Sequence, residues 1–186
     1  MKNGTFIERH LQLQFDDAWH VEKYDGHPNC RQIQKLDGTK AVDFVATQTL
    51  PRKVLYFIEV KDFRTFPTEL RKELKSGSLV AEIAQKLRDT LPGMIGAWRN
   101  PSSQHAWQPF AAGLFDLQTE IHIIVWLESD SPSPVEAPVA MSTLTEELKK
   151  KLCWLTTKVT VLSLKQGRCP DGLEVVSLPF NDSSDG

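Results

Sequence analysis

Three residues whose side chains can bind a metal ion or activate water lie in two apolar segments of the chain. Glu59 and Lys61 are at the end of the apolar segment 54–61, and Asp43 interrupts the apolar segment 41–46. Because side chains alternate between the two faces of a strand, Glu59 and Lys61 share one face of a strand over residues 54–61. A buried carboxylate and a buried ammonium both cost free energy unless a partner or a ligand compensates their charges. This spacing therefore predicts a functional site at the end of a central strand.

An antiparallel pairing of these two segments brings Asp43 next to Glu59. When residues 48–53 form the connection of a hairpin, the early end of one strand lies beside the late end of the other. Two neighbouring carboxylates repel each other unless a divalent cation neutralises them, and oxygen ligands suit Mg²⁺ or Mn²⁺. Lys61 lies on the same face as Glu59, about 6.6 Å further along the strand. From there it could orient an attacking water or stabilise charge developing on a phosphate. We therefore expect Asp43 and Glu59 to be metal ligands.

Further residues are additional candidates for the same site. Glu8 and Glu22 could approach the metal, Glu8 from a short helix or irregular segment over residues 5–15, although a surface position is the favoured interpretation of each acid. Gln85 and Lys86 lie on the polar face of an amphipathic segment and could reach a phosphate if this helix packs beside the two site strands. Ordinary solvation is the favoured alternative for both.

The elements that must position these residues follow from the hydrophobic periodicity. A strand that is apolar on both faces, such as 54–61, is typical of the middle of a sheet covered by helices on each side. Further strands are predicted at residues 19–24, 31–36, 120–127, 158–164 and 172–178. Helices are predicted at 79–88, with Ser78 as N-cap and an interruption or kink at Pro92, and from the capping box at Thr143 onward. Residues 100–108 and 128–142 are predicted as loops.

Length and composition are typical of one globular domain. The chain has 186 residues, of which 40% are hydrophobic, so we expect a single domain over residues 1–180 and a disordered tail over 181–186. The formal net charge of −2 excludes an overall basic nucleic-acid-binding protein. A local basic cluster follows the candidate site and consists of Arg64, Arg71, Lys72 and Lys75.

Cysteine usage and hydropathy indicate the compartment. The 3 cysteines are widely spaced and form no CxxC pair, which argues against a disulfide framework and a zinc site. No segment has the length and hydrophobicity of a secretory signal or a membrane span. We therefore expect a cytoplasmic protein with no membrane attachment.

The arrangement resembles the PD-(D/E)XK nuclease superfamily, which has the restriction-endonuclease-like fold. The resemblance covers roughly residues 5–127: Asp43 in one apolar segment, Glu59-Val60-Lys61 at the end of the next, then an amphipathic helix and another apolar strand. It implies an α/β fold with a central mixed β-sheet of about four to five strands flanked by α-helices. It also assigns metal binding and water activation to the aspartate, the glutamate and the lysine. Glu8 would match a further acid that the family often places on its first helix.

Three longer stretches are similar to short bacterial proteins of unassigned function. These stretches are residues 40–46, 58–64 and 149–157. This similarity implies a bacterial origin and points to no substrate.

Two hypotheses follow for the function. The first is a nuclease that hydrolyses phosphodiester bonds with Mg²⁺ or Mn²⁺ as cofactor and nucleic acid as partner, DNA being favoured over RNA. A homodimer is compatible with it, because cutting both strands of a duplex requires two sites. The alternative is a catalytically inactive nuclease-fold binding or assembly module, in which Glu59 and Lys61 form a structural ion pair.

Overall fold

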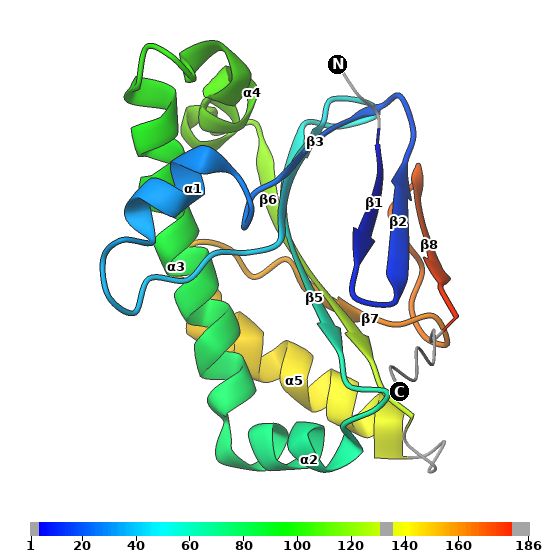
Figure 1. Ribbon diagram of the computed structural model, residues 1–186. Helices are drawn as coiled ribbons and strands as arrows, with labels where there is room; N and C mark the ends of the chain where they lie inside the picture. Colours follow the sequence, from blue (N-terminus) through cyan, green and yellow to red (C-terminus); the bar gives the residue numbers. More distant parts are fainter. Residues whose placement is uncertain (1–3, 131–135, 180–186) are drawn as a thin grey trace, which may run out of the picture.

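The computed structural model describes residues 4–130 and 136–179, which form two β-sheets and a layer of helices (Figure 1). Its strands are β1 (Thr5–Glu8), β2 (Leu11–Phe15), β3 (Trp19–Lys23), β4 (Phe44–Gln48), β5 (Val54–Asp62), β6 (Glu120–Glu128), β7 (Val159–Leu162) and β8 (Leu173–Ser177). Its helices are α1 (Pro28–Ile33), α2 (Pro67–Ser76), α3 (Ser78–Arg99), α4 (Gln104–Phe115) and α5 (Glu136–Leu152). The tail predicted over residues 181–186 lies outside the described residues.

A five-stranded mixed sheet, called the central sheet here, has the strand order β3-β4-β5-β6-β7. The short connections between β3, β4 and β5 produce antiparallel pairs, whereas β6 and β7 continue the sheet in parallel. Parallel pairing needs a long crossover, and helices α2, α3 and α4 supply it between β5 and β6. The predicted α/β class, the mixed sheet and the central place of residues 54–61 are therefore confirmed.

The two faces of the central sheet are covered by different layers. On one face, Leu55 and Phe57 of β5 join a core to which α1, α3, α4 and α5 contribute (Figure 1). On the other face, Tyr56, Ile58 and Val60 pack against a three-stranded antiparallel sheet with the order β1-β2-β8, the small sheet (Figure 1). The expectation that helices cover both faces was therefore wrong.

The small sheet also corrects the prediction for residues 5–15. They form the hairpin of β1 and β2 rather than a short helix or irregular segment. Leu11, Leu13 and Phe15 are buried at every second position, which is the period of a strand. Their side chains cover the apolar face of β5 that the helices leave open.

Three other segments differ from their predictions. Residues 31–36, predicted as a strand, include the end of α1. Pro28 lies in the first turn of this helix, a position that suits proline. His27 caps the helix by accepting a hydrogen bond from the Asn29 N–H. The predicted loop over 100–108 contains the start of α4. Helix α5 begins at Glu136 rather than near Thr143, since proline at position 138 is compatible with a first helical turn.

Helix α3 positions two side chains of the candidate site. It has 22 residues and continues through Pro92, so the predicted interruption is not observed. Its N-cap is Gly77 rather than Ser78. At Gly93, a β-carbon would overlap the hydroxyl group of Tyr24, which follows β3. The absence of a side chain there lets α3 lie close against the end of the central sheet.

Candidate active site

Asp43 and Glu59 meet at one end of the central sheet. Asp43 directly precedes β4, and the register Phe44↔Ile58 places it beside Glu59 and Val60 of β5. The Val60 N–H donates a hydrogen bond of 2.6 Å to Asp43 Oδ2. The Asp43 and Glu59 side chains are only 8% and 0% exposed. The strand pairing predicted from the sequence therefore does bring these two carboxylates together.

Lys86 bridges the two carboxylates from α3. Its Nζ atom lies 2.5 Å from Glu59 Oε1 and 3.6 Å from Asp43 Oδ1. The Lys86 side chain is 16% exposed, so this residue, named only as an additional candidate, is a buried member of the cluster rather than a solvated lysine. Its ammonium group marks a position from which one cation contacts both carboxylates.

Lys61 is a second lysine in contact with Glu59. Its Nζ atom is 3.5 Å from Glu59 Oε1 and 2.9 Å from Glu82 Oε1, and its side chain is 13% exposed. Glu82 was not among the candidate site residues, although its spacing of four residues from Lys86 places both on one face of α3. Acids and lysines therefore alternate in one chain of contacts: Lys40, Glu82, Lys61, Glu59, Lys86 and Asp43.

The other candidates lie outside this contact chain. Glu8 is on a strand, not a helix, and its carboxylate pairs with Lys23 Nζ at 2.6 Å. Glu22 lies on β3 and is half-buried, and its burial raises its pKa. Gln85 directs its amide to the Gly38 carbonyl oxygen. Glu8 still acts on the site through its charge, since it contributes to the raised pKa of Asp43 after the larger effect of burial.

The donor atoms present are compatible with a magnesium or manganese ion. Glu59 Oε2 is buried and has no hydrogen-bond partner among the described residues, so it is an unused acceptor of the cluster. Within the described part of the chain, no three His, Cys, Asp or Glu side chains are grouped as a metal site. Mg²⁺ is commonly held by one or two protein carboxylates together with water and substrate phosphates. Asp43 and Glu59 fit this pattern.

Burial controls the protonation of the cluster. It raises the pKa of Glu59 to about 7, and the Asp43 carboxylate adds to the effect, whereas Lys86 and Lys61 oppose it. Burial also raises the pKa of Asp43, against the Lys86 ammonium and the Val60 N–H. Burial alone would lower the pKa of Lys86, but Glu59 and Asp43 outweigh it and the net shift is upward. Lys86 is therefore charged at neutral pH, while Glu59 titrates near it.

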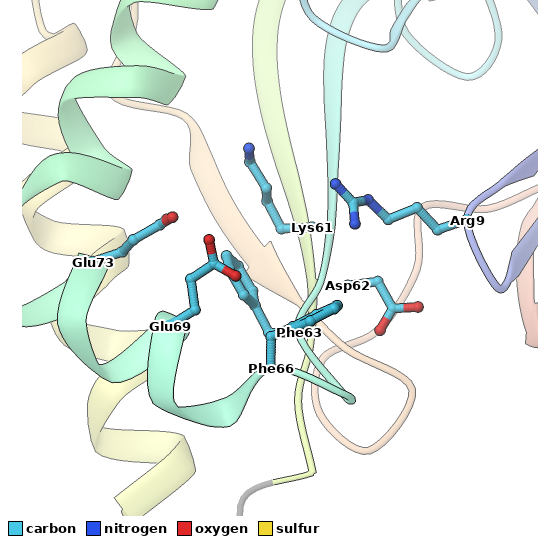
Figure 2. Close-up of a pocket in the computed structure, with 7 residues that line it drawn as sticks. All are labelled: Arg9, Lys61, Asp62, Phe63, Phe66, Glu69 and Glu73. Atoms are coloured by element: carbon cyan, nitrogen blue, oxygen red, sulfur yellow. The ribbon is translucent and has the colours of Figure 1, made fainter.

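A cleft at the end of β5 adjoins the cluster at Lys61. Figure 2 shows Arg9 reaching toward Lys61 from the turn between β1 and β2, with Glu69 and Glu73 facing them from α2. Lys61 is the residue of the cluster that lines this cleft, whereas the Asp43 and Glu59 side chains are almost fully covered.

The basic residues that follow the candidate site in the sequence do not form one cluster in the structure. Arg64 is bound to Asp62, with 2.7 Å between Nη2 and Oδ2. Arg71, Lys72 and Lys75 are exposed on α2, the helix that forms one wall of the cleft.

No family model, curated protein or solved structure matches this chain.

The raised pKa of Glu59 predicts how stability changes with pH. Its ordinary pKa is 4.5, so between about 4.5 and 7 the folded chain binds the proton of Glu59 more tightly than the unfolded chain does. The free energy of unfolding should fall by on the order of 3 kcal/mol from this group as pH rises through that window. Urea unfolding at a series of pH values tests this, with Glu59→Gln as the comparison. The variant should show a smaller decline, and equal declines would contradict the assignment.

Proposed function

We propose that this chain is a metal-dependent nuclease that hydrolyses phosphodiester bonds, with Asp43 and Glu59 as metal ligands and Lys61 positioning the attacking water. The observation that carries the proposal is the convergence of two buried carboxylates from neighbouring strands on one cation position. A lysine ammonium 3.5 Å from one of these carboxylates completes the arrangement. Buried carboxylates are costly, so a pair held this way, next to a cleft that Lys61 lines, is a candidate for metal-assisted hydrolysis.

The arrangement of the elements supports a restriction-endonuclease-like fold as part of this proposal. The resemblance implied a mixed sheet of about four to five strands with flanking helices, and the central sheet has five. Asp43 precedes one strand of an antiparallel pair, and Glu59 and Lys61 lie near the end of the other. The small sheet over the second face goes beyond that expectation.

The protein groups have separate roles in the proposed reaction. A bound Mg²⁺ or Mn²⁺ would supply Lewis-acid stabilisation of the phosphate and a more acidic water. Glu82 holds the Lys61 ammonium beside Glu59, where this ammonium can donate a hydrogen bond to a water or to a phosphate oxygen. Lys86 competes with a divalent cation for the same two carboxylates, because its ammonium already contacts both.

Calorimetric titration with Mn²⁺ tests the metal assignment directly. The wild-type chain should bind Mn²⁺, and Asp43→Asn should weaken this binding by about tenfold or more, since one of two charged ligands becomes neutral. Asp116→Asn is the matched control, because Asp116 pairs with Lys53 at the opposite end of β5. Equal Mn²⁺ binding by wild type and Asp43→Asn would reject Asp43 as a ligand.

The inactive binding or assembly module is the second candidate, and one observation favours it. Lys86 neutralises Asp43 and Glu59 without any metal, so the cluster can serve as a structural ion-pair network. This function predicts no Mn²⁺ binding and no cleavage of single-stranded, duplex, circular or branched nucleic acids. Metal binding that depends on Asp43 would instead favour the nuclease.

We propose DNA rather than RNA as the substrate, a cytoplasmic location, and a homodimer for cutting both strands. The exposed basic residues Arg71, Lys72 and Lys75 on α2 support contact with a phosphate backbone beside the cleft. Among the described residues, no helix is both long enough and apolar enough to cross a bilayer.

A further inference from the structure

The turn between β1 and β2 presents an arginine to the cleft in an unusual backbone conformation. The backbone φ angle of Arg9 is 55°, and Arg9 is the one residue other than glycine with a positive φ among the described residues. A non-glycine residue in this conformation is strained, because its β-carbon lies too close to the carbonyl oxygen that follows. Strain of this kind is often retained where a side chain must point in a functional direction.

The Arg9 side chain is available for a ligand. Arg9 is exposed, and within residues 4–130 and 136–179 its guanidinium group has no carboxylate partner. Figure 2 shows this group directed toward Lys61 across the upper part of the cleft. A guanidinium group binds a phosphate through two parallel N–H···O hydrogen bonds. The Arg9 side of the cleft therefore suits an anionic group, and the Lys61 ammonium, which Glu82 and Glu59 hold in place, lies next to it.

The opposite wall has a different chemistry. Phe66, at the start of α2, lines the cleft and is 54% exposed, so its ring can contact a planar group. Glu69 and Glu73 line the same wall, where their carboxylates can accept hydrogen bonds from amino groups and repel a second phosphate backbone. Asp62, the remaining acid of the lining, is neutralised by Arg64. The cleft thus combines a cationic side with an aromatic and acidic side.

We propose that this cleft binds one unpaired nucleotide of a DNA strand, with its phosphate held between Arg9 and Lys61 and its base against Phe66. The inference rests on the proposed nuclease function. It specifies that the substrate is single-stranded DNA or a locally opened duplex. Arg9 is then a positioning residue that directs the strand past Lys61 toward the buried carboxylates. Glu69 and Glu73 on α2 disfavour an intact duplex inside the cleft, so the proposed homodimer would cut the two strands of a duplex where they are locally opened.

Fluorescence anisotropy with labelled single-stranded DNA and the matching blunt duplex tests this inference. The titrations are made in EDTA, so that binding is measured without cleavage. Arg9→Gly is the informative variant, because glycine accepts φ 55 without strain and the fold should be at least as stable. Arg52→Gly is the matched control, since Arg52 is an exposed arginine at the opposite end of β5.

Arg9→Gly should weaken binding of the single strand by about tenfold. It should also reduce the slope of log affinity against log salt concentration by about 1. Arg52→Gly should change neither quantity. Phe66→Leu should weaken single-strand binding more than duplex binding, because it removes the ring but keeps apolar bulk. Unchanged affinity of Arg9→Gly, or equal binding of the duplex and the single strand by wild type, would overturn the proposal. A failure of the proposed nuclease function would give a different result. Metal-dependent cleavage would then be absent, while Arg9→Gly would still weaken binding.

Discussion

Replacing Glu59 by glutamine is expected to lower metal-dependent DNA cleavage by about a thousandfold, because the ion supplies several kcal/mol of transition-state stabilisation and each 1.36 kcal/mol is worth about tenfold. Glutamine has nearly the same shape as glutamate, and Glu59 has a fully buried side chain. The substitution removes the charge that would hold the cation and leaves the packing of β5 in place. Initial rates of cleavage with Mg²⁺ and with Mn²⁺ measure the effect.

The result is informative only if the variant remains folded. Circular dichroism and thermal unfolding should show a stability close to that of the wild type, since glutamine removes a buried carboxylate whose pKa is already raised to about 7. Glu146→Gln is the matched control, because Glu146 is an exposed residue of α5 that pairs only with Lys149 in the described structure. Full activity in Glu59→Gln would exclude Glu59 as a metal ligand.

Replacing Lys86 by methionine is expected to lower the free energy of unfolding at neutral pH by about 3 kcal/mol, because removing one partner of a buried ion pair leaves uncompensated charge. Methionine keeps the length and apolar stem of the side chain, so packing against the sheet changes little. Asp43 and Glu59 would lose the ammonium that contacts both of them. Urea unfolding of wild type and variant at pH 7 measures the difference.

Two further measurements identify the cause of that loss. At pH 5 the loss should be smaller, because the raised pKa of each carboxylate favours its neutral form as pH falls. Added Mn²⁺ should recover part of the stability in Lys86→Met, since a cation that binds only the folded chain stabilises it. Arg88→Met, an exposed change on the same helix, should have little effect. A pH-independent loss that Mn²⁺ does not alter would point to packing instead.

Local sequence patterns were sufficient to predict the central strands and the approach of Asp43 to Glu59. The apolar run from Val54 to Val60 had to be buried on both faces, and the connection from Gln48 to Lys53 was short enough to require antiparallel pairing with β4. These two facts place Asp43 beside Glu59. The contacts of Lys86 were harder to predict. The direction of its side chain depends on how α3 packs across the sheet, which hydrophobic periodicity alone does not determine.

The small sheet shows what sequence patterns could not supply. The alternation of Leu11, Leu13 and Phe15 was present, but the stretch is short and strands of this length gain their stability from partners. Its partner β8 lies far away in the sequence, and no local signal links the two. Consequently the position of Arg9, at the turn of this hairpin, could not be predicted either.

Pairing between β2 and β8 also affects the order in which the chain can fold during its synthesis. Strand β2 lies between β1 and β8, so one of its edges stays unpaired until residues 173–177 have left the ribosome. Contacts between such distant segments carry a large loop-closure cost and tend to form late. The hairpin that presents Arg9 would then become fixed only after the carboxylate cluster is in place. For the proposed nuclease, a growing chain would therefore lack a fixed Arg9, and with it the proposed strand-binding cleft, until synthesis reaches β8.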